Sequence, residues 1–141
     1  MILDTNFLIA LDEGMPSAIE KARGIERQGY PRRVPEIVAY ELWVAVGKGT
    51  RTAHRRQKYE QLLDGLPRVT LTAAIAKRAG KIEGETQATD PNGSGIGAAD
   101  AIVAATALET DEPVVTDDGR DFVNRIQDTL GYSDLRVELY T

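Results

Sequence analysis

Short apolar runs alternate along the chain with longer segments in which apolar residues recur every three or four positions. The first run, residues 2–4, ends in Asp4-Thr5-Asn6, whose side chains favour caps and turns, so it predicts a short strand followed directly by a helix. Later short strands are predicted at Val34, 69–71, 113–116 and 136–140. A strand therefore precedes most of the helical segments.

Helical spacing marks the segments between these strands. In the stretch that begins at Ser17, apolar residues keep this spacing until Gly29 and Pro31 end it, and Thr72 is the expected cap of a later helix. Residues 87–97 are rich in turn-forming residues and are predicted to be a loop. After the first helix, the predicted helices cover 17–28, 36–46, 52–66, 73–86, 98–108 and 122–130.

Strands that alternate with helices predict a parallel sheet with helices on both faces, which is the doubly wound α/β architecture. At 141 residues the chain has the size of one domain, and we expect a single domain over residues 1–141. Sheets of this kind bind ligands beyond the carboxyl ends of their strands. Asp4 and Asp118 each follow a predicted strand, so both side chains are expected at that edge.

The segment 98–108 is an apolar, helix-forming run that carries one carboxylate, Asp100, near its start. A helix that is apolar on every side is normally buried, and an unpaired buried charge is costly unless it is neutralised or finds a partner. We therefore expect Asp100 to share a divalent metal with carboxylates from elsewhere in the sequence. Its place near the amino end of the helix puts it at the mouth of the sheet, so only the rest of the helix need be buried.

Four acids stand out by their position: Asp4, Glu41, Asp100 and Asp118. Each also has an ordinary explanation. Asp4 and Asp118 are suited to capping the helices that follow them, and Glu41 is suited to an exposed helix face. Asp100, in a first helical turn, gains from the helix dipole. Together the four acids indicate a binding site, because their mutual repulsion at one sheet edge requires a counter-charge.

The available residue types limit what that counter-charge is. The chain has no Cys and a single His, His54, which excludes disulfides, thiol nucleophiles, and zinc sites built on sulfur or on two histidines. An all-oxygen ligand set favours Mg²⁺ or Mn²⁺. An acidic metal cluster activates water and stabilises in-line attack on phosphorus, which indicates hydrolysis of a phosphodiester or phosphate ester. His54 is predicted to be solvated rather than a general base.

Charge is unevenly distributed, with a net value of −5 and an acidic tail after Leu108. This balance argues against a protein that coats nucleic acid non-specifically, but it is compatible with a nuclease. Six basic residues fall in the segment 48–68: Lys48, Arg51, Arg55, Arg56, Lys58 and Arg68. They form either a phosphate-facing patch or an ordinary solvated helix face. Tyr40 and Trp43 are expected in core or dimer packing, with base stacking as the alternative.

Other sequence signals are negative. No apolar run has the length of a membrane span, and Met1 leads directly into the first strand without a charged leader. We therefore expect a cytoplasmic protein with no membrane partner. Residues 93–97 contain two glycine-containing triplets, but these triplets match neither a nucleophile elbow nor a dinucleotide-binding turn, and the chain has no P-loop.

Four segments in order along the chain are similar to those of a known family: MILDTN at 1–6, VAYELWVAVGK at 38–48, GIGAADAIVAATAL at 95–108 and VVTDDGRDF at 114–122. Together they resemble the PIN-domain ribonucleases, and most closely the VapC-type toxins of bacterial and archaeal toxin–antitoxin pairs. The resemblance implies a PIN-like three-layer sandwich and a Mg²⁺- or Mn²⁺-dependent endoribonuclease. It also implies a homodimer and a small antitoxin partner that occludes the acidic site.

The resemblance assigns metal-site carboxylates to four positions: Asp4, Glu41, Asp100 and Asp118. It also implies that Asn6 and Thr116 contact these ligands without binding the metal themselves. In the last motif the family's Thr-x-Asp pattern selects Asp118. Asp121 is then a candidate supplementary ligand, and Asp117 is expected in a surface turn.

Two other functions remain open at the level of sequence. A small phosphatase of the haloacid dehalogenase type also begins with an Asp at a strand end that binds Mg²⁺, but that family requires a second Asp two residues later, where this chain has Asn6. The other alternative is a PIN fold that binds RNA or protein as a scaffold without turnover. The presence of all four acids favours the enzyme.

Overall fold

The apolar runs of the sequence form parallel strands at the centre of the protein. The computed structural model describes residues 1–49 and 52–141, without the side chains of residues 52–54, so Arg51 and the His54 side chain lie outside the described residues. The strands are β1 (Ile2–Leu3), β2 (Val34–Pro35), β3 (Arg68–Val69), β4 (Val114–Thr116) and β5 (Val137–Leu139). Each predicted strand is present, within one or two residues at its ends.

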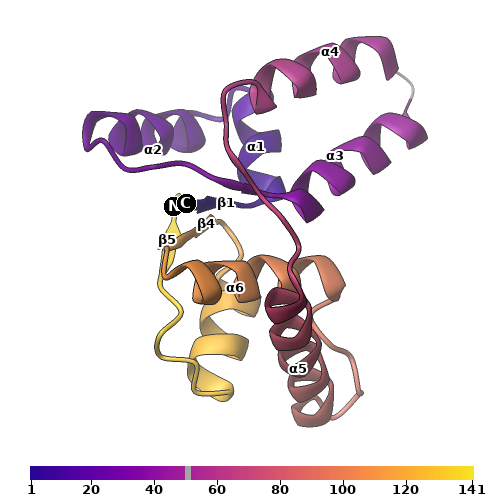
Figure 1. Ribbon diagram of the computed structural model, residues 1–141. Coiled ribbons are helices and arrows are strands. Elements are labelled where there is room, and N and C mark those ends of the chain that lie inside the picture. Colours follow the sequence, from indigo (N-terminus) through magenta and orange to yellow (C-terminus); the bar gives the residue numbers. More distant parts are fainter. Residues whose placement is uncertain (50–51) are drawn as a thin grey trace.

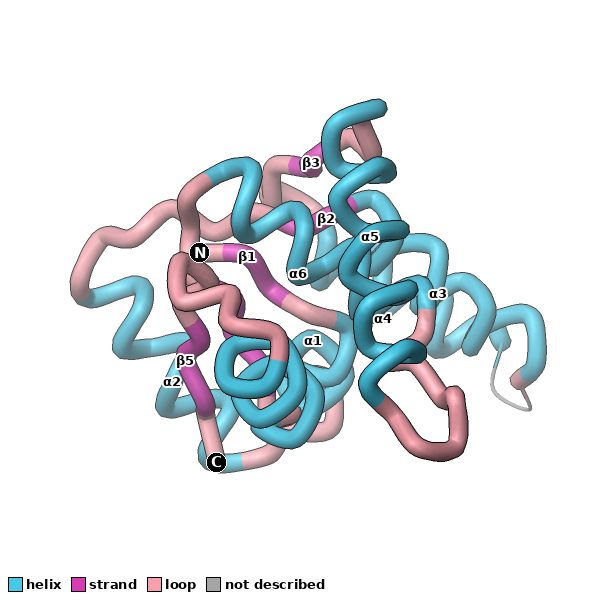
Figure 2. The backbone as a smooth tube through the Cα atoms, turned by 90° about the horizontal axis from the view of Figure 1, so that it is seen from below, coloured by secondary structure: helices cyan, strands magenta, loops and turns pink. Residues whose placement is uncertain are grey.

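The pairing of the strands brings two carboxyl ends together. β4 pairs in parallel with β1 on one side and with β5 on the other, and β2 pairs in parallel with β3. A bridge between Ile2 and Arg33 connects the two groups, which gives the order β3-β2-β1-β4-β5. Figure 2 shows β3, β2, β1 and β5 in this sequence across the molecule. Because β1 and β4 are parallel neighbours, the residues that follow them meet at one edge.

Helices cover both faces of this sheet, as predicted. They are α1 (Thr5–Asp12), α2 (Pro16–Arg27), α3 (Glu36–Lys48), α4 (Thr52–Leu63), α5 (Ala73–Thr89), α6 (Ala98–Thr110) and the wide helix η1 (Arg120–Thr129). In Figure 1, α1 and α2 lie on one side of the strands, and α6 and the golden η1 lie on the other. α3 packs with α4 beyond α1, and α5 packs along α6. The fold is thus an α/β three-layer sandwich.

Two of the residues expected to cap helices, Asp4 and Thr72, do so. The Asp4 carboxylate accepts a hydrogen bond from the Phe7 N–H at 2.8 Å and begins α1. The Thr72 hydroxyl accepts one from the Ile75 N–H at 3.2 Å and begins α5. Each bond satisfies one of the N–H groups that a helix leaves without a partner at its amino end.

The carboxyl end of α5 differs from the prediction, because residues 87–89 are helical rather than part of the loop. The hydroxyl groups of Thr86 and Thr89 donate to carbonyls of the preceding turn, at 2.7 and 3.0 Å, so these polar residues are accommodated within the helix. The helix ends only at Asp90, where the following Pro91 disfavours a helical conformation.

The other helices with predicted bounds differ from them by one to three residues at one or both ends, and α4 and η1 show local geometry at these ends. α4 ends at Leu63, three residues early, because the chain turns at Gly65 with a φ of +76°, which lies in the left-handed region that favours glycine. η1 begins at residue 120 rather than 122. Its turns are wide, since the Leu130 N–H donates to the Arg125 carbonyl five residues earlier, at 3.0 Å.

Small side chains allow α6 to lie against the sheet. Ala101, Ala104 and Ala105 are at most 1% exposed, whereas Asp100, at the third position of the helix, is only half-buried. The expectation that Asp100 lies at the mouth of the sheet while the rest of its helix is buried is therefore confirmed. Among the described residues, no helix is both long and apolar enough to cross a bilayer.

Candidate metal centre

Asp4 follows β1 and faces the interior as well as capping α1. Its side chain is 4% exposed and accepts hydrogen bonds from the Phe7 N–H and from the Thr116 hydroxyl. Burial raises the pKa of Asp4 to about 6 although both hydrogen bonds oppose the shift, and the charges of Asp117 and Asp118 raise it further. Asp4 is therefore both a cap and an acid that is costly to ionise without a counter-charge.

Thr116, the last residue of β4, connects two of the acids. Its hydroxyl donates to Asp4 and accepts from the Asp118 N–H at 3.0 Å, and its side chain is fully buried. Asp118 in turn accepts from the Asp121 N–H at 2.9 Å, as a capping residue does at the start of a helix. One buried hydroxyl thus sets the position of Asp4 relative to Asp118, which fits the supporting role expected for Thr116.

Asp100 lies at the centre of the acidic group. One carboxylate oxygen from each of Asp100, Asp118 and Asp121 lies within 4.8 Å of the other two. Burial raises the pKa of Asp100 to about 7, and the charges of Asp118, Asp121, Glu41 and Asp4 add to the shift. The fold therefore brings all four of the predicted acids to one place, together with Asp121.

Glu41 reaches this group from α3. It is half-buried, and one of its oxygens accepts a hydrogen bond from the Thr5 hydroxyl at 2.5 Å. Its negative charge is close enough to raise the pKa of Asp100. The ordinary explanation of Glu41 as an exposed helical residue is therefore wrong, because α3 packs against α6 and turns this side chain toward the sheet edge.

Asp121 lies nearer the centre of the group than a supplementary role suggested. Among the described residues, it is Asp121 rather than Asp4 or Glu41 that shares the 4.8 Å group with Asp100 and Asp118. Burial and the charge of Asp118 raise its pKa, and Arg125 opposes that shift. The signal in the sequence is its spacing, since residues three apart in a first helical turn lie on one face.

The remaining predicted residues lie outside the group. Asn6 is exposed in the first turn of α1, so its supporting role stays a prediction. Asp117 is exposed in the turn after β4, as expected. Trp43 packs obliquely on the buried Tyr59 ring, with ring centres 6.5 Å apart, whereas Tyr40 is 65% exposed on the outer side of α3.

Sequence reasoning missed two residues that hold the acids in place. Thr5 fixes one oxygen of Glu41, and its position directly after Asp4 was the available signal. Arg125 forms an ion pair with Asp121 at 3.4 Å, and the four-residue spacing on one helix was the signal in that case.

The donor set fits a hard divalent cation. The group offers carboxylate oxygens only, and burial first, then neighbouring negative charges, raise the pKa values of Asp4, Asp100 and Asp121. A divalent cation would offset the cost of ionising buried carboxylates and their mutual repulsion. Oxygen ligands are those that Mg²⁺ and Mn²⁺ prefer. Asp100, Asp118 and Asp121 are the residues whose spacing suits direct binding.

Thr116→Val tests whether the buried hydroxyl organises the centre. The substitution keeps the side-chain shape but leaves the Asp118 N–H and the Asp4 carboxylate each short of one hydrogen bond. We expect the free energy of unfolding in urea to fall by about 1 to 3 kcal/mol. Thr116→Ser keeps the hydroxyl and serves as the control; equal stability of the Val variant and the wild type would contradict the assignment.

A model of the PIN domain family matches residues 1–126. A search of curated protein sequences finds no significant match.

Several solved structures share the fold over nearly the whole chain. VapBC2 from Rickettsia felis, bound to a DNA fragment from its promoter, aligns with a TM-score of 0.79 and 20% identity, covering 99% of this chain and 98% of that one. DNA-bound VapBC from Salmonella typhimurium aligns with a TM-score of 0.79, 22% identity and coverage of 99% and 97%. A toxin–antitoxin complex from Klebsiella pneumoniae aligns with a TM-score of 0.70 and 22% identity, covering 99% of this chain and 97% of that one. At such identities the likeness establishes the fold alone.

Proposed function

The chain belongs to the PIN domain family, and we propose that it is a Mg²⁺- or Mn²⁺-dependent endoribonuclease that acts as the toxin of a type II toxin–antitoxin pair. The observation that carries the proposal is the convergence of five carboxylates, from the end of β1, α3, α6, the β4–η1 turn and the first turn of η1, on one edge of a parallel sheet. We also propose that residues 1–141 form one PIN domain and that it works in the cytoplasm, where its RNA substrate is found.

In the proposed mechanism, Asp100, Asp118 and Asp121 would hold the ion, and Asp4 and Glu41 would add negative charge beside it. The bound ion would activate a water molecule and offset the charge that develops on the phosphodiester during in-line attack. The protein contributes by holding its carboxylates in fixed positions, and the charge of the ion would keep them ionised against burial and mutual repulsion.

Two hydroxyl groups provide that fixation. Thr116 holds Asp4 and the backbone of Asp118, and Thr5 holds Glu41. Because both hydroxyl contacts involve partly or fully buried groups, the acids are positioned before substrate arrives, which lowers the cost of reorganisation during the reaction.

The proposed protein partners are a second copy of the chain and a small antitoxin that occludes the acidic edge. Similarity to toxin–antitoxin complexes supports the second of these. The surface of α3 supports association in general, since Tyr40, Trp43 and Val44 are 65%, 37% and 38% exposed. Large apolar side chains grouped on one surface helix are typical of a protein–protein contact.

The activity is tested with purified protein free of any antitoxin and a panel of structured RNAs. We expect discrete cleavage products with Mg²⁺ or Mn²⁺ and none with EDTA. RNA that is bound but uncut with either ion would favour the scaffold. Hydrolysis of a small phosphate monoester with no cleavage of RNA would favour the phosphatase.

A separate prediction concerns the basic segment 48–68 as the RNA-facing surface. Lys58 pairs with Asp12 at 3.5 Å and Arg68 with Glu36 at 3.3 Å, so part of this charge is balanced within the protein. Arg56 is exposed, and Arg55 donates to the Tyr59 hydroxyl at 3.1 Å.

Reversing both charges, Arg55→Glu with Arg56→Glu, is expected to weaken RNA binding and to reduce the slope of log affinity against log salt by about 1 to 2, since each phosphate contact contributes about 0.7 on single strands. Reversal of Arg27, which is exposed on α2, is the control. An unchanged affinity and slope would show that the segment is an ordinary solvated face.

A further inference from the structure

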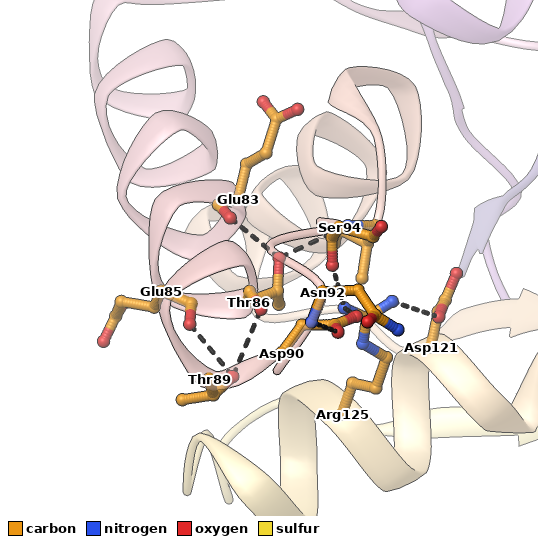
Figure 3. Close-up of polar contacts among 10 residues, drawn as sticks. Glu83, Glu85, Thr86, Thr89, Asp90, Asn92, Ser94, Asp121 and Arg125 are labelled. Atoms are coloured by element: carbon orange, nitrogen blue, oxygen red, sulfur yellow. Dashed lines mark hydrogen bonds and ion pairs between the residues drawn. The ribbon is translucent and has the colours of Figure 1, made fainter.

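Arg125 lies in η1 at the junction between the metal centre and the loop that joins α5 to α6. Its guanidinium contacts Asp121 Oδ1 at 3.4 Å, Asp90 Oδ2 at 3.3 Å and the Ser94 carbonyl at 2.6 Å. Figure 3 shows the side chain among these three partners, of which Asp121 lies on η1 and the other two lie in the α5–α6 loop. With 20% of its side chain exposed, Arg125 is mostly enclosed by them.

The loop that Arg125 contacts is itself closely held. The Asn92 N–H donates to Asp90 Oδ1 at 2.8 Å, and the buried Ile96 N–H donates to the Thr86 hydroxyl at 3.3 Å. A Cβ atom at Gly95 would lie 2.8 Å from Cγ of Gln87, so a larger residue at this position would force the Gln87 side chain to move. The loop therefore has one well-defined path.

This loop leads directly to Asp100. It ends at Gly97, whose φ of +86° turns the chain into α6, and Asp100 follows three residues later. Asp121 lies four residues before Arg125 on the same helix. One guanidinium therefore joins the helix that carries Asp121 to the segment that sets the start of the helix carrying Asp100.

We propose that Arg125 is a positioning residue that keeps Asp121 and Asp100 in register for metal binding by tying η1 to the α5–α6 loop. The inference rests on the proposed metal site. A planar guanidinium suits this role because it donates in several directions at fixed angles, which a lysine ammonium on its flexible stem does not reproduce.

The sign of the effect on metal affinity separates positioning from simple electrostatics. A positive charge beside a cation site repels the cation, so removal of the Arg125 charge on its own would strengthen metal binding. Loss of register would instead weaken it. Residues that orient metal ligands typically change metal affinity by about 10- to 100-fold when they are replaced.

The test titrates Mn²⁺ into the wild type, Arg125→Gln and Arg125→Lys, with free Mn²⁺ measured by electron paramagnetic resonance. We expect Arg125→Gln to bind Mn²⁺ about 10-fold more weakly. Arg125→Lys keeps the charge, and its Mn²⁺ affinity is expected to lie between those of the wild type and Arg125→Gln. Arg78→Gln is the control, because Arg78 also forms an ion pair, with Glu109 on α6 at 2.6 Å, that joins α5 to α6 away from the centre.

Amide hydrogen exchange without metal gives a second result that does not depend on activity. We expect Arg125→Gln to accelerate exchange at Asn92 and Ile96, whereas Arg78→Gln leaves both unchanged. Mn²⁺ affinity in Arg125→Gln or Arg125→Lys equal to or tighter than that of the wild type would overturn the positioning role while leaving the proposed function intact. Absence of Mn²⁺ binding by the wild type would overturn both.

Discussion

Asp100→Asn is expected to lower metal-dependent RNA cleavage by about 1000-fold while the protein remains folded. Asp100 belongs to the group of carboxylates within 4.8 Å of one another, and all the other acids of the centre act on its pKa. Replacing one oxygen of this carboxylate by an amide nitrogen removes both a ligand atom and a negative charge. The measurement is single-turnover cleavage of one RNA at saturating Mg²⁺, for the wild type and the variant.

The same substitution is expected to stabilise the metal-free protein. At pH 8 and in EDTA the wild type must keep Asp100 ionised against burial and against its neighbours, a penalty that an amide does not have. A gain of about 1 kcal/mol corresponds to a rise in Tm of roughly 3 to 5 °C for a chain of this size. Asp128→Asn, on the exposed side of η1, is the control and is expected to change neither property.

The two results together identify the role of Asp100. A variant that cleaves RNA at the wild-type rate would remove Asp100 from the active centre. A variant that fails to fold would mean that Asp100 is a structural acid whose contacts stabilise the start of α6. A functional carboxylate is held in place at the expense of stability. Only such a residue gives a variant with lost activity and raised metal-free stability.

The alternation of strands and helices could be predicted because burial leaves a clear periodicity. Ile2 and Leu3 are buried on both sides in the sheet, and the turn-forming Asp4 then begins a helix at once. The order of the strands could not be predicted in the same way. β2 joins β1 through Arg33, a half-buried polar residue whose bridge to Ile2 leaves no periodic pattern in the sequence.

The candidate site was predictable to the extent that it follows from strand ends. Asp4 and Asp118 each follow a parallel strand, so the sheet type places both at the same edge, and the pairing of β1 with β4 then brings them close together. The central place of Asp121 depends on how the first turn of η1 folds back on Asp118, and the role of Arg125 depends on the path of the α5–α6 loop. Neither local turn geometry nor a loop path is set by the spacing of apolar residues.

The stability of the metal-free protein is expected to fall as the pH rises from 5 to 8. The pKa of Asp4 is raised to about 6 and that of Asp100 to about 7, so between pH 4 and pH 7 the folded state binds more protons than the unfolded state. The stabilisation from these protons is complete below the unfolded pKa and is lost as the pH rises through the folded values. After allowance for partial exposure and for coupling of the two acids, the loss is about 3 kcal/mol.

A divalent metal is expected to reverse this dependence, because it replaces the protons that the carboxylates release. Urea unfolding at pH 5, 6, 7 and 8 in EDTA should show falling stability, and saturating Mg²⁺ or Mn²⁺ should add more stability at pH 8 than at pH 5. The ion pair that lowers the pKa of Glu112 acts in the opposite direction only at lower pH, outside this window.

Asp100→Asn provides the internal comparison for this experiment. Its metal-free curve should be flatter than that of the wild type, since the acid with the larger shift no longer titrates. Its response to metal at pH 8 should be much smaller, because a member of the closest carboxylate group is gone. Metal-free stability that rises from pH 5 to pH 8 would show that the carboxylates are balanced by other groups, and the case for a cation at this edge of the sheet would then fail.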